Sequence, residues 1–401
     1  MADTANKTAT LRVGVVGLGT ASTQVLPFFG KLPHIVLGAG ADVRPEARDA
    51  FTRKYDAPAF AGIEDICRRD DIDAVWIATP NDLHAEHVVL AANHGKHVVC
   101  EKPMALSMEE CDRMIAAAER NGVKLLQGHS KIYNAPIRKI GEIVRSGVLG
   151  RVVQIDTWNF NDWLQRPRLA SEVDTARGGG ICYRQGPHQV DIVRYIGGGR
   201  VKSVRASVGR HDPHFDTEGS YQAFLAFEDG ASATLAFNGY GFFDVAELTW
   251  GIGESGRPKS EDDLRSAKPR LTGALPAAEK YALAPTHGGS GERPNQPFFG
   301  LTVVSCEMGV IRQSPHGLYI YDADGCREIP CPSGRGRGDE LIELDAAIRE
   351  NRPAFPDGRW GKATLEVCLA MLESSRLGRD IVLHHQNPVA VGAHAFAAVE
   401  A

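Results

Sequence analysis

Apolar and polar residues follow two different rhythms along this chain of 401 residues. In the first third, short apolar runs alternate with stretches of helical spacing, as expected for strands and helices that follow one another. The predicted strands cover residues 13–16, 35–41, 73–79, 98–100 and 124–127, and the predicted helices lie around Phe51, at 84–94 and at 107–121. This βαβα order predicts a parallel, doubly wound α/β sheet of the Rossmann type over residues 11–130.

The rhythm changes near Gly150, where apolar and polar residues begin to alternate one by one. Such alternation predicts antiparallel strands with one solvated face, and we expect an α+β domain with a mostly antiparallel open sheet over residues 131–383. Its strands are predicted at 152–158, 201–208, 220–227, 231–238, 301–304 and 317–321, with helices at 339–351 and 362–377. The Gly- and Pro-rich stretch 251–298 predicts a long loop or insertion. Residues 1–10 and 384–401 are predicted tails.

Composition narrows the class of protein. Hydrophobic residues make up 43% and charged residues 24%, which is typical of a soluble globular protein. A net charge of −5 gives no indication of nucleic-acid binding. No apolar run is long enough for a membrane span, and no signal peptide is visible. The eight cysteines form no Cys-x-x-Cys pair, so we expect a reduced, cytoplasmic compartment and no metal site.

A glycine turn follows the first predicted strand. Gly17 permits a tight turn, and Gly19 lets the backbone around Thr20 and Ala21 approach a pyrophosphate. The third glycine of the usual motif is Ser22 here, so a turn without a ligand is the alternative. Asp42 ends the second strand, where a carboxylate can accept hydrogen bonds from both ribose hydroxyls of NAD. Arg44 could tolerate the phosphate of NADP, so the preference for NAD need not be strict.

Lys102 lies directly after a predicted strand, in Glu101-Lys102-Pro103. The carboxyl edge of an open α/β sheet is where ligands bind, and Pro103 restrains the backbone of the lysine. A nearby nicotinium cation would lower the lysine pKa, because like charges disfavour the protonated form. Lys102 could then exchange protons near neutrality. The alternative is a solvated lysine at a strand end.

Four stretches together resemble the Gfo/Idh/MocA family of oxidoreductases: Gly17-Leu18-Gly19 with Asp42, residues 78–84, residues 100–103, and residues 178–191. The resemblance implies that Thr79, Pro80, Asn81 and His84 line the cofactor and that Glu101 contacts it or positions Lys102. It also implies that Lys102 and His188 flank the substrate. The open sheet of the second domain often forms the oligomer interface in this family, so a homo-oligomer, dimer or tetramer, is expected. The alternative for Asn81 and His84 is a place in the cap and first turn of the following helix.

Arg184 departs from the family pattern, which commonly has aspartate four residues before the histidine. A planar guanidinium suits a carboxylate rather than a sugar hydroxyl. The alternative is that Arg184 pairs with an internal acid such as Glu172 or Asp174. Other residues expected around the cleft also favour an anionic, flat ligand, and Arg177 precedes the triple glycine. The predicted substrate-binding residues are Lys102, His129, Lys131, Tyr133, Trp158, Asn159, Arg166, Arg168, Arg184 and His188.

Within the family, this pattern is similar to that of phthalate cis-dihydrodiol dehydrogenases. The resemblance implies NAD-dependent oxidation of phthalate cis-4,5-dihydrodiol to 4,5-dihydroxyphthalate, with hydride transfer to nicotinamide C4. Lys102 is expected to take the hydroxyl proton, with His188 as the second candidate. Two alternatives stay open: a sugar or inositol dehydrogenase of the same family, and a non-enzymatic cofactor-binding regulatory protein.

Overall fold

A six-stranded parallel sheet forms the first part of the molecule. We describe it from a computed structural model, which covers residues 10–266, 270–283 and 294–390. The strand order β3-β2-β1-β4-β5-β6 places β1 beside β4, where the order of the chain reverses. This is the Rossmann arrangement, and it confirms the predicted fold class. The strands are β1 (Leu11–Val16), β2 (Ile35–Ala41), β3 (Ala59–Phe60), β4 (Ala74–Ile77), β5 (His97–Glu101) and β6 (Leu125–Gly128).

Helices cover both faces of this sheet, which is why the central strands are buried on both sides. The α-helices are α1 (Pro45–Tyr55), α2 (Ile63–Cys67), α3 (His84–Asn93) and α4 (Met108–Arg120). Ser107 caps α4, as its sequence predicts, by accepting a hydrogen bond from the backbone of Glu110 at 3.2 Å.

The glycine turn does not open an α-helix, contrary to the sequence-based expectation. Two 3₁₀ segments follow it instead, η2 (Ser22–Gln24) and η3 (Leu26–Lys31). The hydroxyls of Ser22 and Thr23 donate to the carbonyls of Gly19 and Thr20, at 2.8 and 2.7 Å. Such side-chain bonds compete with helical backbone bonds, and Pro27 removes a donor one turn later.

The second sheet has nine strands in the order β14-β13-β12-β11-β7-β10-β9-β8-β15. Neighbours are antiparallel except β10 and β7, which pair in parallel. The hairpins β11–β12 and β13–β14 add two strands that the sequence pattern does not indicate. The strands are β7 (Val152–Phe160), β8 (Val201–Gly209), β9 (Ser220–Phe227), β10 (Ser232–Asn238), β11 (Leu301–Cys306), β12 (Gly309–Gln313), β13 (Gly317–Asp322), β14 (Gly325–Pro330) and β15 (Ile381–Val382).

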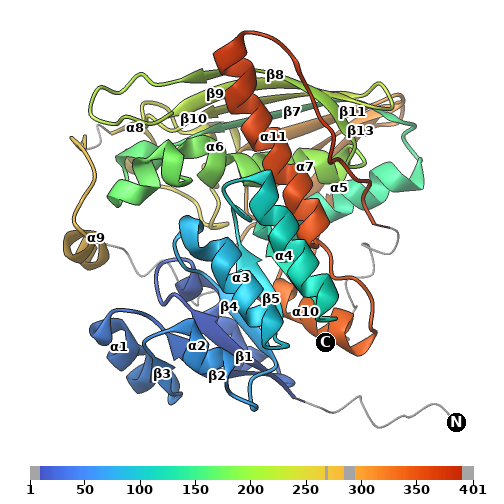
Figure 1. Cartoon of the computed structure of the whole chain (residues 1–401). Helices are drawn as coiled ribbons and strands as arrows, with labels where there is room; N and C mark the ends of the chain where they lie inside the picture. Colours follow the sequence, from blue (N-terminus) through green and yellow to red (C-terminus); the bar gives the residue numbers. More distant parts are fainter. Residues whose placement is uncertain (1–9, 267–269, 284–293, 391–401) are drawn as a thin grey trace, which may run out of the picture.

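One face of the second sheet packs on helices, and Figure 1 shows α6 and α7 between the two sheets. These helices are α5 (Ala135–Ser146), α6 (Gly180–Arg184), α7 (Gly186–Ile196) and the long α11 (Gly358–Leu377). Between β14 and α11 the chain returns to the first sheet. There α10 (Gly338–Arg349) buries Leu341 and Leu344 in one cluster with Val13 and Leu126. The two parts of the molecule therefore contribute side chains to the same apolar cluster.

The stretch predicted as a loop, residues 251–298, contains two short helices in its described portion: α8 (Glu261–Arg265) and α9 (Ala277–Leu283). Of the predicted tails, residues 1–9 and 391–401 lie outside the described residues. Within the described ranges, no helix is both long and apolar enough to cross a membrane. The same ranges hold no group of three His, Cys, Asp or Glu side chains placed to bind a metal ion.

Candidate active site

The glycine turn has the geometry that a dinucleotide requires. Gly17 has φ of +88°, and a Cβ atom at this position would lie 2.5 Å from the carbonyl oxygen of Ala78. At Gly19 the nearest atom to such a Cβ would be the hydroxyl of Tyr281, at 3.9 Å. The first glycine is therefore required by packing, whereas the space beside the second is open, next to the backbone of Thr20 in the sequence. This open space fits the close approach of a pyrophosphate.

Asp42 and Arg44 form a rigid pair at the end of β2. The guanidinium of Arg44 donates from Nε and Nη2 to the two carboxylate oxygens of Asp42, both at 2.9 Å. The backbone N–H of Leu18 donates to the same carboxylate at 2.9 Å, which ties it to the glycine turn. Burial opposes the charge of Asp42, but the hydrogen bonds from Arg44 prevail and the pKa of this carboxyl is lowered. A carboxylate held ionised here suits ribose hydroxyls.

The loop after β4 is held by buried polar contacts rather than left free for a ligand. His84 is buried, with Nδ1 at 2.8 Å from the carbonyl of Pro103 and Nε2 at 3.0 Å from that of Thr79. Asn81 donates to the carbonyl of Gly178 at 2.7 Å, which joins this loop to the triple glycine. Both side chains thus fix loops at the sheet edge, while Pro80 is exposed.

Lys102 lies at the junction of the two parts of the molecule. Its Nζ donates to the backbone carbonyl of Arg184 at 2.7 Å. Burial lowers the pKa of Lys102 to about 7, and the positive charge of Arg184 adds to this effect. The sequence-based expectation assigned the lowering to a bound nicotinium. In the structure, the protein itself already produces it.

His188 is buried beside this lysine and is held by packing. Its ring meets Phe299 edge-on, with centroids 5.1 Å apart, and Nδ1 has no hydrogen-bond partner within the described part of the chain. Burial, together with the charges of Lys102 and Lys131, lowers the pKa of His188 well below its usual value. A neutral imidazole with a free nitrogen can hydrogen-bond a substrate hydroxyl, but it is a weaker base than Lys102.

His129 is fixed by a buried acid. Its Nδ1 lies 3.0 Å from Oδ1 of Asp191, which also accepts a hydrogen bond from the indole N–H of Trp360. A histidine that donates from Nδ1 presents Nε2 as an acceptor. The predicted substrate-binding role of His129 would therefore use Nε2.

Glu101 lies in a buried ionic cluster. Its carboxylate accepts from Arg337 at 2.7 Å and from the indole N–H of Trp76 at 3.3 Å. Arg337 also binds Glu340, whose pKa is raised to about 8 by burial. Of the two roles expected for Glu101, this placement suits the positioning of the neighbouring Lys102.

Arg184 pairs with an internal acid, which was the alternative in the sequence analysis. Its Nη2 donates to Glu172 at 2.9 Å, and Lys280 of α9 binds the other carboxylate oxygen. Arg168 lies nearby, stacked 4.0 Å above the ring of Trp163 and bonded to the carbonyl of that residue. These cations lower the pKa of Glu172 to about 2 in spite of its burial. Three cationic side chains therefore surround one carboxylate.

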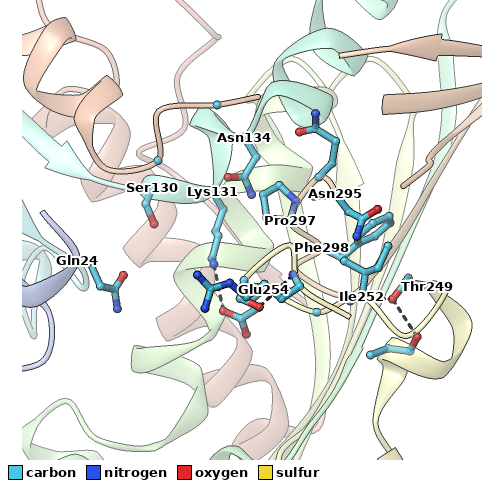
Figure 2. Close-up of a pocket in the computed structure, with 18 of the residues that line it drawn as sticks. Gln24, Ser130, Lys131, Asn134, Thr249, Ile252, Glu254, Asn295, Pro297 and Phe298 are labelled. Carbon is cyan, nitrogen blue, oxygen red and sulfur yellow. Dashed lines mark hydrogen bonds and ion pairs between the residues drawn. The ribbon is translucent and has the colours of Figure 1, made fainter. Parts of the chain in front are cut away.

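A cleft of about 1340 Å³ opens between the first part of the chain and the second sheet. Lys131, Arg166 and Arg337 line it, whereas Lys102, Arg184 and His188 are not among its lining residues. Figure 2 shows Lys131 reaching Glu254 in this cleft, with Gln24 on one side and Phe298 on the other; the Lys131 Nζ lies 3.1 Å from the Glu254 carboxylate. Arg166 also lines the cleft and pairs with Asp162 at 2.8 Å.

Three further predicted residues lie in this region with different orientations. Asn159 lines the cleft, and its Nδ2 is buried with no partner in the described ranges. Tyr133 is also at the wall, but its hydroxyl donates to the carbonyl of Phe355 at 2.8 Å. The structure does not bring Trp158 to the cleft: it is 47% exposed, on the face of β7 opposite to Asn159. Successive strand residues point to opposite faces, so only one of this pair can face the site.

Sequence reasoning does not point to four residues that the structure places at the site: Glu254, Lys280, Tyr281 and Arg337. The first three belong to the stretch predicted as a loop. The helix-forming composition of 277–283 is the one signal that could have indicated α9. Arg337 is distant in sequence from every motif and carries no local signal.

Comparison with known proteins gives matches over most of the chain. The family described as "Oxidoreductase family, NAD-binding Rossmann fold" matches residues 11–129, and the "GFO/IDH/MocA C-terminal domain" matches residues 137–243. A relative from Comamonas testosteroni, 1-carboxy-3-chloro-3,4-dihydroxycyclohexa-1,5-diene dehydrogenase, is 36% identical over 91% of this chain and 95% of its own length.

Two further matches are a curated enzyme of lower coverage and a solved structure. Myo-inositol 2-dehydrogenase from Thermotoga maritima is 29% identical over 49% of this chain and 58% of its own length. A crystal structure from Bordetella bronchiseptica RB50 superposes with a TM-score of 0.85 at 39% identity, covering 93% of this chain and 100% of the other.

Proposed function

Because this chain belongs to the Gfo/Idh/MocA family of oxidoreductases and binds NAD, we propose that it is a dehydrogenase of a carboxylated cyclic cis-diol. The observation that carries the proposal is the excess of cations around Glu172, the acid that pairs with Arg184, whose backbone carbonyl binds the Lys102 amine. Arg168, Arg184 and Lys280 surround a single acid, Glu172. Buried charges are stable only when compensated, so this cluster favours a further anion.

The chemistry of this cluster and of the relative supports one identity for the diol. The Comamonas relative is named for a ring that carries one carboxyl group and two adjacent hydroxyls. Phthalate cis-4,5-dihydrodiol also has two adjacent hydroxyls on a cyclohexadiene ring, without the chlorine of that compound, and its two ring carboxylates match the two cations that Glu172 does not neutralise. We therefore infer that it is the substrate and that 4,5-dihydroxyphthalate is the product.

The reaction removes one hydride and one proton from the diol. NAD, when bound, supplies the hydride acceptor at nicotinamide C4. Lys102 in its neutral form takes the hydroxyl proton as the carbinol C–H bond breaks, and this gives a ring ketone. The ketone enolises to the catechol, with a gain in aromatic stabilisation. His188 holds the hydroxyl, and Arg184 holds a carboxylate, so the carbinol carbon is oriented for transfer.

Two rival functions use the same fold. An inositol or sugar dehydrogenase is supported by the Thermotoga relative, although Arg184 offers no acceptor to a sugar hydroxyl. A regulatory cofactor-binding protein would have no need of Lys102 and His188 together. For the cofactor, Asp42 favours NAD, while Arg44 leaves use of NADP open.

A parallel assay of the purified protein separates these functions. The substrates are cis-dihydrodiols with two, one and no carboxyl groups, together with myo-inositol, each with NAD⁺ and with NADP⁺. The proposal predicts the highest kcat/KM for a carboxylated diol with NAD⁺. Higher activity on inositol, or no turnover of any of these substrates, would contradict it.

The role of Arg184 has its own test. Arg184→Ala should raise KM for the carboxylated diol at least tenfold, in line with the loss of a charge-assisted hydrogen bond of about 1.5–3 kcal/mol. Arg177→Ala is the matched control, because Arg177 pairs with Asp82 at the surface. Equal KM values in the two variants would remove Arg184 from the substrate site.

We also propose that the protein is a homo-oligomer, dimer or tetramer. The face of the nine-stranded sheet that carries no helix exposes Trp158 and Phe224, each 47% accessible. Aromatic side chains grouped on an uncovered sheet face are typical of subunit interfaces.

A further inference from the structure

Helix α9 lies against the cofactor-binding turn although it belongs to the second part of the chain. It follows β10 in sequence and precedes β11, yet Figure 1 shows it away from the second sheet, on the side of α1. Two adjacent side chains explain this position. Lys280 binds Glu172, and Tyr281 lies on Arg44.

The contact between Tyr281 and Arg44 forms a flat wall at the adenosine end of the site. The guanidinium carbon of Arg44 lies 4.1 Å from the ring centroid of Tyr281. Two bonds to Asp42, and a third at 3.3 Å to the carbonyl of Leu18, fix the plane of this guanidinium. The Tyr281 hydroxyl is also the atom nearest to the open space at Gly19. The ring therefore borders both the ribose-binding carboxylate and the expected path of the pyrophosphate.

We propose that Tyr281 is a cofactor-contacting residue, which covers the adenosine half of the dinucleotide from the second part of the chain. Nucleic bases stack on aromatic rings and on guanidinium planes, and such stacking does not depend on the base. Lys280 holds the helix by its bond to Glu172, so the ring is presented without a large loss of entropy on binding. This inference concerns the cofactor alone and holds whatever diol the enzyme oxidises.

The test is calorimetric titration of the full-length protein with NAD⁺, AMP and nicotinamide mononucleotide. Tyr281→Ala should raise the Kd for NAD⁺ and for AMP roughly fivefold to 100-fold, the range expected for one aromatic stack. Tyr281→Phe keeps the ring and should bind almost as the natural protein does. Nicotinamide mononucleotide has no adenosine, so its Kd should not change in any of these variants.

Two more variants make the result decisive. Tyr281→Leu keeps an apolar side chain without the flat ring, so its Kd values should resemble those of Tyr281→Ala. If the alanine variant does not fold, the leucine variant serves in its place. Glu279→Ala changes an exposed residue of the same helix and should leave all three Kd values unchanged. An unchanged Kd for NAD⁺ in both ring-deleted variants would overturn the proposal. Tighter binding would also overturn it, because the ring would then occupy cofactor space instead of covering it.

Discussion

The amine of Lys102 lies among cations as well as beside one acid. Burial lowers its pKa most, Arg184, Lys131 and Arg337 lower it further, and Glu101 acts in the opposite direction. Glu101 is at the same time engaged by Arg337, at 2.7 Å. The carboxylate of Glu101, which would favour the charged form of the lysine, is thus already paired with Arg337. Burial therefore dominates and lowers the pKa of Lys102 to about 7.

We expect Lys102→Met to reduce kcat by roughly 10²–10⁴-fold, the usual contribution of a general base. In the natural protein, kcat should rise with pH up to about 7 and then level off, because only the neutral amine accepts a proton. Steady-state rates between pH 5.5 and 9.5 test both statements. If kcat of Lys102→Met still rises with pH in the same range, the group that titrates is not Lys102.

The same substitution also separates a catalytic role from a structural one. The lowered pKa means that the folded state disfavours the ammonium form, so the charge of Lys102 destabilises the fold at pH values below its unfolded pKa. This destabilisation is largest below pH 7 and disappears as the pH rises towards that unfolded value. Lys102→Met should therefore unfold at the same or a higher urea concentration at pH 6. A lower midpoint would indicate a structural role.

Arg184→Ala should act on Lys102 as well as on substrate affinity. Removal of the cation that contributes most to lowering the lysine pKa, after burial, should shift the rise in kcat to higher pH. Arg184→Lys retains a positive charge and should leave the profile near its natural position. Identical profiles for the alanine variant and the natural protein would show that the charge of Arg184 does not reach the amine.

Among the structural elements, the glycine turn shows why one residue type is required at one position. Gly17 and Gly95 both have positive φ, +88° and +71°. A Cβ atom at Gly95 would meet nothing within 4 Å, whereas at Gly17 it would collide with the backbone of Ala78. A residue with a Cβ atom would therefore strain the backbone at both positions, but only at Gly17 would that atom also collide with a neighbour.

This pair gives a matched prediction of stability. Gly95→Ala should cost about 1–2 kcal/mol, the strain of a left-handed alanine. Gly17→Ala should cost about 1–3 kcal/mol more, from the added collision, and should weaken NAD⁺ binding. Urea unfolding and NAD⁺ titration measure the two effects. If the two variants lose equal free energy of unfolding, the turn can move away from Ala78, the residue after β4, at no cost in stability.

At the scale of elements, sequence periodicity predicts the parallel sheet well because buried strands and amphipathic helices have strong signals. It does not predict η2 and η3, since the hydroxyls of Ser22 and Thr23 compete with the helical backbone. It also does not reveal α9, which lies within a Gly- and Pro-rich stretch and depends on tertiary contacts of Lys280 and Tyr281. A helix of seven residues has little stability of its own.

For the whole molecule, the open sheet face leads to a prediction about assembly. Trp158→Glu combined with Phe224→Glu should convert the oligomer to monomers, because buried unpaired carboxylates are costly at an interface. Light scattering during size-exclusion chromatography gives the mass of each species. Phe242→Glu is the control, since Phe242 is 84% exposed but follows β10 rather than facing the sheet. A natural protein that is already monomeric would contradict the prediction.

The candidate site could be predicted from sequence only where its residues lie in local motifs. Gly17, Asp42, Lys102 and His188 follow strands or glycines that set their positions. The orientation of Trp158 could not be predicted, because it depends on which face of β7 the helices cover. Contacts such as Arg337 with Glu101 join residues 236 positions apart, and no local pattern reports them.

The hydrogen bond that Lys102 donates is accepted by a main-chain oxygen, the carbonyl of residue 184. Every amino acid carries this atom, so the bond places no demand on the side chain at that position. A change of side chain there can alter which molecule is recognised, while the amine keeps its partner and the cofactor turn is untouched. Substrate preference in this enzyme can therefore change through this one side chain while the bond from Lys102 is kept, and the charge of the new side chain sets only the pH at which the amine becomes neutral.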